Sequence, residues 1–373
     1  MSAGESDWKI FNKVAILGTG LMGGSLGMAL REKGLATEVI GYDEDRHSCE
    51  IAVEKGAIDN FAHSSQEAVE RADLVILAVP VRLCCDIFWE CLSSLKAGTV
   101  VSDLGSTKQF ITTEVSPYLP SGVTFIGGHP MTGSDESGIG AADPTLLENA
   151  IYVLTPQPGD PQPVVDSLQK MVRGIGAQPL LLSPAEHDRV VALVSHLPHL
   201  AAIALVTTAA NEGDEEMVKT LAAGGFRDTT RIAMGDPEVW QDIFVTNPKA
   251  IDQFLTSYQK ELEELRLIIN EGKESDLKER LRQAQIYRKN IPHRSRGIFP
   301  EIFDLVVLVK DTPGVIGKIA TLLGERNLNI AEVEILHVRE ESGGSIRFGF
   351  REEKERDRAI DVLKQEGYRA HRR

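Results

Sequence analysis

Short apolar runs alternate with helical patterns along the first half of the chain. The runs carry few polar positions, as do strands that are buried on both faces of a parallel sheet. They are Val14–Leu17, Val39–Tyr42, Leu74–Val79, Val100–Ser102, Thr124–Ile126, Ile151–Leu154 and Leu180–Leu182. This alternation predicts a doubly wound α/β domain over residues 1–182.

The second part of the chain, residues 183–292, shows helical periodicity alone. Ser183 to Glu186 has the form of a capping box, and the helix that follows is apolar on nearly every side as far as about Ala210. Such a helix is expected to be buried on all sides, but the helical part of one chain has too few residues to cover it. We therefore expect an all-helical domain that pairs with a second copy of the chain, giving a homodimer.

A basic, proline-bounded segment, residues 292–300, precedes the third part, residues 301–373. The expected elements there are a strand, a helix, two strands, a helix and a strand. They are Ile302–Val309, Gly314–Arg326, Ile330–Val338, Ser345–Phe350, Lys354–Gln365 and Tyr368–His371. The βαββαβ order predicts a small ferredoxin-like domain.

Charge and cysteine content narrow the choice of partners. The formal net charge of −15 repels nucleic acid and anionic membranes, so an anionic substrate needs a locally basic pocket. Four cysteines without a CxxC pair argue against a disulfide framework or a metal site and fit a reducing cytoplasm. The longest apolar stretch, Val190 to Val206, is judged too short and too polar to span a membrane. We expect a soluble, cytoplasmic protein.

A glycine-rich segment directly after the first strand predicts a dinucleotide site. Gly18 permits a tight turn, Gly20 lets a pyrophosphate approach the backbone, and Gly23 allows close packing of helix on strand. Asp43 ends the next strand, where a carboxylate would hold the ribose hydroxyls and repel a 2′-phosphate. The pattern therefore indicates a Rossmann-like domain that binds NAD rather than NADP, although Arg46 lies near enough in sequence to soften that preference. The residues expected to line the cofactor also include Leu21, Met22, Val79 and Pro80.

Polar segments gather where strands and helices end. Residues 102–108 and 127–135 each follow a strand, which places them at the carboxyl edge of the sheet, where this architecture binds ligands. Residues 195–199 and 224–231 are polar segments of the helical part. Their histidines lie on separate segments without paired carboxylates, so no metal site is predicted.

Five motifs in this order resemble the prephenate dehydrogenase family across about residues 12–292. They read GTGLMGGSL, DLGSTK, GGHPMTGSDESG, SHLPH and GGFRDTTRIAMGDPEVW. The resemblance implies NAD-dependent oxidative decarboxylation of prephenate to 4-hydroxyphenylpyruvate, a step of L-tyrosine biosynthesis.

The resemblance also implies roles for single residues. His129 matches the catalytic histidine and would accept the proton of the ring hydroxyl, since imidazole is a base near neutral pH. Ser106 would hydrogen-bond His129 or that hydroxyl. Arg231 matches the arginine that binds a substrate carboxylate. We expect His199 at the substrate's side chain and Gly225, Ser134 and Asp135 around the substrate, with His196 packed as a structural residue.

From Phe303 the sequence resembles an ACT-type regulatory domain. Such domains hold an amino acid near the first strand–helix turn, and L-tyrosine is the ligand expected as a feedback effector. The residues expected around it are Asp311, Gly314, Val315, Ile316, Asn327 and Asn329. A domain that only dimerises is the alternative, because a fold does not name its ligand.

Three other functions stay open at this level. The same chemistry on arogenate is favoured if Asp135 faces the substrate's ammonium group. A different two-domain hydroxyacid dehydrogenase would need a catalytic lysine motif in the helical part, and none stands out. A non-catalytic amino-acid sensor is opposed by the presence of His129, Ser106 and Arg231.

Overall fold

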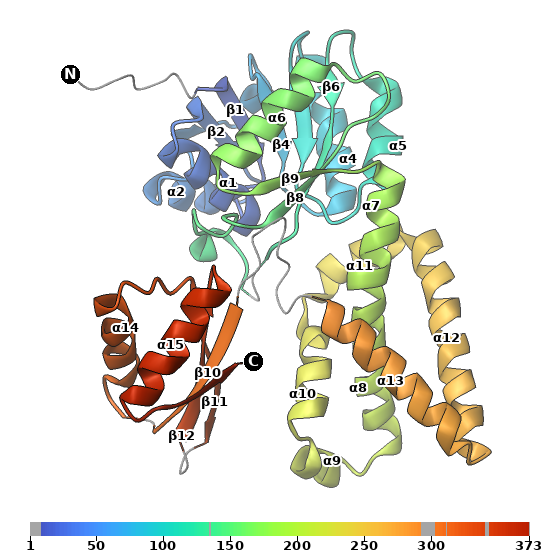
Figure 1. Cartoon of the computed structure of the whole chain (residues 1–373). Helices are drawn as coiled ribbons and strands as arrows, with labels where there is room; N and C mark the ends of the chain where they lie inside the picture. The colour runs from blue at the N-terminus through green and yellow to red at the C-terminus, as the bar shows by residue number, and fades with distance from the viewer. Residues whose placement is uncertain (1–8, 134–135, 292–302, 311, 340–342, 373) are drawn as a thin grey trace. The chain divides into compact units, whose positions relative to one another are not determined.

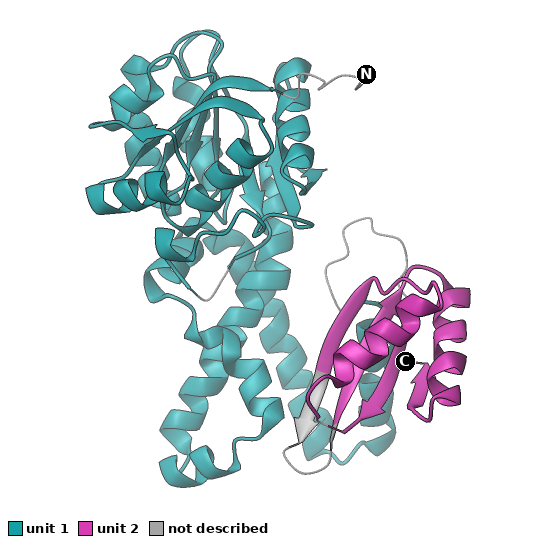
Figure 2. Cartoon of the chain, turned by 90° about the vertical axis from the view of Figure 1, so that its left-hand side faces the viewer, with its two compact units in different colours: residues 1–297 teal, residues 298–373 magenta. Residues whose placement is uncertain are grey.

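A computed structural model describes residues 9–133, 136–291, 303–310, 312–339 and 343–372. The chain divides into two compact units, Met1–Gly297 and Ile298–Arg373 (Figure 2). The basic, proline-bounded segment 292–300 lies outside the described residues.

The first unit is built on a six-stranded parallel sheet with the order β3-β2-β1-β4-β5-β6 (Figure 1). Its strands are β1 (Phe11–Leu17), β2 (Ala36–Tyr42), β3 (Asn60–Phe61), β4 (Leu74–Leu77), β5 (Val100–Asp103) and β6 (Thr124–Phe125). The helices and 3-10 turns between them are α1 (Leu21–Glu32), α2 (Arg46–Glu54), α3 (Ser65–Val69), α4 (Val81–Cys91), η1 (Leu92–Ser94), α5 (Gln109–Val115) and η2 (Ser116–Tyr118). Strand order reverses at β1, so the crevice between the carboxyl ends of β1 and β4 is where this topology binds ligands.

A second, three-stranded sheet follows, with the order β7-β8-β9. Its elements and neighbours are β7 (Gly127–Pro130), η3 (Ile139–Ala141), β8 (Ile151–Thr155), α6 (Gln162–Gly174) and β9 (Gln178–Leu181). The predicted fold class is confirmed, but the strands do not form one continuous sheet: β7, β8 and β9 form a separate sheet, in which β7 pairs antiparallel with β8. A Cβ on Gly128 would lie 2.6 Å from the carbonyl oxygen of Asp103, so only glycine lets β7 lie this close to β5.

The rest of the first unit is helical. It contains α7 (Pro184–Val191), a π-helical turn η4 (Ala192–His196), α8 (Leu197–Glu212), α9 (Glu215–Leu221), α10 (Gly224–Thr230), η5 (Arg231–Met234), α11 (Pro237–Thr246), α12 (Pro248–Asn270) and α13 (Glu274–Asn290). The predicted capping box is present: Ser183 accepts from the backbone of Glu186, whose side chain accepts from the backbone of Ser183.

The helix α8 differs from its prediction. Only His199 and Ala202 are buried in it, so within one chain it is not buried all round. The continuous helical stretch Pro184–Glu212 has 29 residues and is long and apolar enough to cross a membrane by length and composition alone. The expectation that this stretch is too short and too polar is therefore wrong. The reason is that the helix continues beyond Val190 and Val206 at both ends, through partly polar residues, and so reaches a length of 29 residues.

The second unit has the predicted βαββαβ order. Its elements are β10 (Phe303–Val309), α14 (Val315–Glu325), β11 (Glu332–Arg339), β12 (Gly343–Phe350), α15 (Glu353–Gln365) and β13 (Arg369–Arg372). The sheet is antiparallel with the order β11-β12-β10-β13. Leu305, Phe348 and Phe350 are fully buried in the core between this sheet and its helices.

Candidate active site

The glycine loop after β1 has the shape that a dinucleotide phosphate needs. Gly18 has a φ of +101°, and a Cβ there would lie 2.4 Å from the carbonyl oxygen of Ala78. A Cβ on Gly23 would lie 2.0 Å from the carbonyl oxygen of Gly18, so helix α1 packs directly on the loop. At Gly20, by contrast, nothing lies within 4 Å of the Cβ position, which leaves the backbone open to a phosphate group.

Asp43 lies against this loop. Its Oδ2 accepts a hydrogen bond from the backbone N–H of Thr19 at 2.8 Å, and its Oδ1 accepts from that of Asp45 at 3.0 Å. The remaining lone pairs of the carboxylate are available to ribose hydroxyls. Val79, which follows β4, borders Gly18. These residues fit a bound dinucleotide.

His129 lies on β7 and is half-buried. Its Nδ1 is 2.8 Å from Nε2 of His187, and Nδ1 of His187 is 2.8 Å from Oδ1 of Asp188. The same carboxylate accepts from the backbone N–H groups of Lys108 at 2.7 Å and Gln109 at 2.9 Å. Helix α7 is thus joined to the loop after β5 and to His129.

A buried ion pair supports the same loop. The side chains of Lys108 and Asp103 are fully buried and bonded to each other. Asp103 also accepts from the backbone N–H of Gly105 at 2.9 Å and that of Gly128 at 3.1 Å. One carboxylate therefore joins the loop after β5 to the strand that carries His129. The cation of Lys108 is neutralised inside the protein and does not face a substrate.

Burial holds the pKa of His129 well below its usual value, and the nearby His187, Lys108 and His196 act in the same direction. His129 is therefore a neutral imidazole at physiological pH, as a general base must be before it accepts a proton.

His199 is buried against Trp240, with ring centroids 3.5 Å apart and an interplanar angle of 14°. Its Nδ1 is buried without a hydrogen-bond partner among the described residues. A cavity of about 430 Å³ borders this pair and is otherwise lined mainly by apolar side chains, Ile203 and Phe244 among them. An unpaired polar atom beside a cavity is the arrangement that a ligand group could complete.

For the other described residues expected at the substrate, the structure gives the element and the exposure. Arg231 is an exposed residue at the start of η5, which packs on α8, and Gly225 is exposed in α10. Ser134 and Asp135 lie outside the described residues. Ser106 is half-buried between Gly105 and Thr107. Because Nδ1 of His129 is hydrogen-bonded to His187, the partner left for Ser106 is Nε2 of His129 or the substrate. His196 is buried, with its Nδ1 3.4 Å from Nδ2 of Asn247, as expected of a structural residue.

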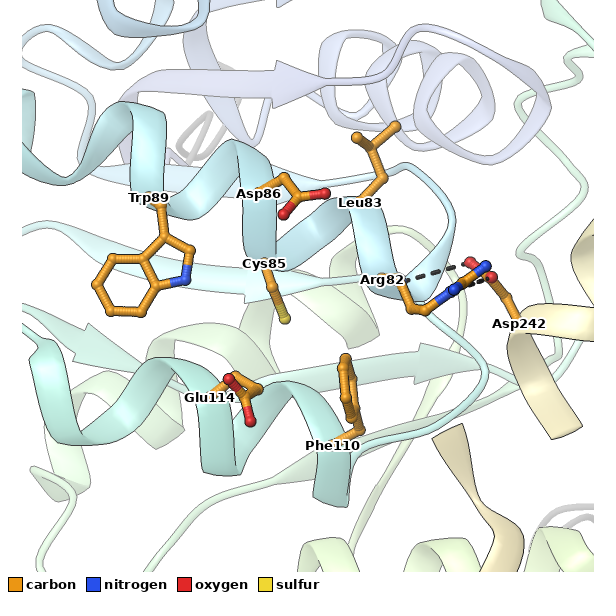
Figure 3. Close-up of a pocket in the computed structure, with 8 residues that line it drawn as sticks. All are labelled: Arg82, Leu83, Cys85, Asp86, Trp89, Phe110, Glu114 and Asp242. Carbon is orange, nitrogen blue, oxygen red and sulfur yellow. Dashed lines mark hydrogen bonds and ion pairs between the residues drawn. The ribbon is translucent and has the colours of Figure 1, made fainter. Parts of the chain in front are cut away.

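The helix that carries Trp240 is bound to the nucleotide-binding part. Figure 3 shows Arg82, in the first turn of α4, reaching Asp242 of α11, with 2.7 Å between Nε and Oδ1. Thr107 and Thr246 share a second bond, 2.8 Å between their hydroxyl oxygens. A cavity of about 530 Å³ lies beside the ion pair and reaches to Trp89. Since Arg82 follows Pro80 by two residues, α11 is anchored beside the expected cofactor loop.

The expected regulatory residues lie in the second unit. Gly314 has a φ of +85° and caps the N-terminus of α14, which begins with Val315 and Ile316. Asn327 has a φ of +56°, and both Asn327 and Asn329 are exposed. Asp311 lies outside the described residues.

Sequence reasoning missed His187, Asp188 and Asp103. The available signal was weak: an adjacent histidine and aspartate in a short helix that also carries Glu186 and Arg189, and an aspartate at the end of a buried strand. Among the described residues, no group of three or more His, Cys, Asp or Glu side chains is placed to hold a metal ion.

Family models match three successive parts of the chain. The model for the prephenate dehydrogenase nucleotide-binding domain matches residues 26–181, and that for the prephenate dehydrogenase dimerization domain matches residues 183–283. The ACT domain model matches residues 303–366.

Two relatives of known function align over most of their length. The chain is 36% identical to the prephenate dehydrogenase of Bacillus subtilis, over 94% of this chain and 95% of the relative. It is 31% identical to the cyclohexadienyl dehydrogenase of Zymomonas mobilis, over 74% of this chain and 94% of the relative.

Solved structures agree with this. The prephenate dehydrogenase of Aquifex aeolicus in complex with hydroxyphenyl propionate and NAD+ has a TM-score of 0.71 at 32% identity, and the match covers 75% of this chain and 98% of that one. The arogenate dehydrogenase of Synechocystis has a TM-score of 0.67 at 31% identity, over 74% and 99%. The chain therefore belongs to the prephenate dehydrogenase family and carries an ACT domain after its dehydrogenase part.

Proposed function

We propose that this protein is an NAD-dependent prephenate dehydrogenase in which His129 is the general base. The observation that carries the proposal is a neutral imidazole held on β7, next to the end of β5 and at the same sheet edge as the glycine loop. NAD is the cofactor that the open backbone at Gly20 and the carboxylate of Asp43 would hold. That carboxylate would repel a 2′-phosphate, which favours NAD over NADP.

The chemistry needs few groups from the chain. Bound NAD supplies a hydride acceptor for the carbon that bears the ring hydroxyl. Nε2 of His129 takes the hydroxyl proton, carbon dioxide leaves, and the ring becomes aromatic. The proton then returns from His129 to the ring oxygen, so the imidazole ends in the state in which it began. Ser106 donates a hydrogen bond that holds the hydroxyl near His129.

Arg231 binds a carboxylate of prephenate, and Arg231→Ala is expected to raise the KM for prephenate roughly 10- to 100-fold. This range follows from losing a charged hydrogen bond of about 1.5–3 kcal/mol. Steady-state kinetics measure the effect, and kcat should change little. Arg227→Ala is the matched control, since Arg227 is an exposed arginine of the adjacent α10. Equal KM values for the two variants would show that Arg231 does not bind the substrate.

The pH dependence of kcat/KM tests His129 in the free enzyme. The base works only when neutral, so activity is lost as the pH falls through its pKa. Because the pKa of His129 is lowered, the acidic limb should lie below about pH 6.5, the usual histidine value. The groups around His129 are His187, Lys108 and His196, with Asp188 and Asp103 beyond them. A limb at or above about pH 6.5 would contradict the assignment.

Dimer formation, tyrosine regulation and a cytoplasmic location complete the proposal. Val194, Leu205 and Val206 of the apolar helical stretch are exposed in one chain, and a second copy would cover them. L-Tyrosine is the proposed ligand of the ACT domain, near Gly314. The four cysteines are unpaired, which fits a reducing compartment.

One experiment separates prephenate from arogenate as the substrate. NADH formation is measured with each compound, with NAD and with NADP, in the presence and absence of L-tyrosine. Prephenate with NAD should give the highest kcat/KM, and tyrosine should lower the rate. A preference for arogenate would support the alternative that the Zymomonas and Synechocystis relatives keep open. No turnover of either compound would refute the proposed function.

A further inference from the structure

The hydrogen bonds behind His129 form a continuous chain from an anion to the base. His187 and Asp188 are 1% and 3% exposed, so water does not compete for these bonds. The contacts run from Asp188 Oδ1 to His187 Nδ1 and from His187 Nε2 to His129 Nδ1, each over 2.8 Å. Neither His187 nor Asp188 has a place in the chemistry described above.

The donor and the acceptor of each hydrogen bond are assigned by starting from Asp188, at one end of the chain of bonds. Both oxygens of Asp188 accept backbone N–H groups, Oδ1 from Lys108 and Oδ2 from Gln109, so the group is a carboxylate and only accepts. Nδ1 of His187 must then carry a hydrogen and donate it. With His187 taken as a neutral imidazole, which has one N–H, Nε2 of His187 accepts and Nδ1 of His129 is the donor to it. Nε2 of His129 is left with a bare lone pair.

We propose that His187 and Asp188 are positioning residues that fix His129 in the tautomer whose Nε2 is the base. The proposal rests on the proposed role of His129. The choice of tautomer matters because a neutral histidine free in water prefers its hydrogen on Nε2. In that tautomer, Nε2 would present a donor to the substrate hydroxyl, where an acceptor is needed. The same contacts oppose ring rotation, and the carboxylate partly compensates the positive charge that His129 gains when it takes the proton.

Two substitutions of His187 distinguish this role from packing. His187→Gln keeps an acceptor for His129 and a donor for Asp188, so the direction of the bonds is preserved. His187→Leu fills a similar volume but has neither. We expect His187→Leu to lower kcat by about 10²-fold or more, within the range that general base catalysis contributes, while the KM for prephenate stays near wild type. His187→Gln should recover most of the lost kcat.

The tautomer is measured directly by ¹⁵N NMR of the full-length protein labelled at histidine, with His129→Asn to assign the resonances. Wild type should show a hydrogen on Nδ1 of His129 and none on Nε2. His187→Leu should shift that population toward Nε2–H. This measurement needs no substrate, so it decides the positioning role even if the wild-type protein does not turn over prephenate.

Either of two results would overturn the inference. One is wild-type His129 with its hydrogen on Nε2. The other is an equal kcat for the Leu and Gln variants when both unfold at the same temperature, which would leave His187 with a packing role alone. If the wild-type protein did not turn over prephenate, that result would instead refute the proposed function.

Discussion

Replacing His129 with asparagine should lower kcat by about 10²- to 10⁴-fold, the contribution expected of a general base. The amide of asparagine can still donate a hydrogen bond toward Nε2 of His187, but it has no basic nitrogen for the substrate. The cofactor loop is untouched, so the affinity for NAD should stay near wild type. Turnover is followed by NADH absorbance, and NAD binding by calorimetry.

The control for this substitution is His47→Asn. His47 is an exposed histidine of α2 whose side chain is 75% accessible, so its loss should leave kcat unchanged. If His129→Asn kept more than about a tenth of the wild-type kcat, the loss would be smaller than the lower bound of about 10²-fold for a general base, and His129 would not be the base.

Lys108→Met is expected to lower the free energy of unfolding of the first unit by about 3–5 kcal/mol. Methionine keeps the length of the side chain but removes its charge. Asp103 would then be a fully buried carboxylate held only by the backbone N–H groups of Gly105 and Gly128. Leaving one charge of a buried pair uncompensated costs far more than losing an exposed pair.

Denaturant unfolding followed by tryptophan fluorescence measures this change, because all three tryptophans of the chain precede residue 298. Lys33→Met is the matched control. Lys33 and Glu148 form an ion pair of 3.1 Å on the surface, with side chains 44% and 36% exposed, so its loss should cost less than about 1 kcal/mol. Equal losses for the two variants would show that the pair of Lys108 and Asp103 contributes little to stability.

The local features of the site could be read from the sequence. Gly18 and Gly20 lie in one loop and Gly23 in the first turn of the helix after it, and the reason for each glycine lies within this segment or beside β4. The capping box at Ser183 is likewise a contact over three residues. Periodicity located most of the strands and helices of both units, because it reports which face of each element is apolar.

Contacts between distant segments could not be read in the same way. His129 and His187 are 58 residues apart, and Asp188 meets the loop after β5 across about 80 residues. No local pattern shows that α7 docks there. The strand β7 was missed because Gly127, Gly128 and Pro130 are poor strand formers, although close packing on β5 requires the glycines. An apolar helix such as α8 predicts burial, but the sequence does not say whether the covering surface lies in the same chain.

The π-helical turn Ala192–His196 sets the rotation of α8 about its axis relative to α7. A regular α-helix advances about 100° per residue, so deleting one residue from this turn would rotate all of α8 by about that angle. His199 would leave the face of Trp240, while Asp188, on the other side of the turn, would stay in place. One extra residue therefore orients two imidazoles of a single helical stretch independently, His187 toward the base and His199 toward the aromatic pocket. Length variation at this turn would retune the pocket that contains His199 without disturbing His129.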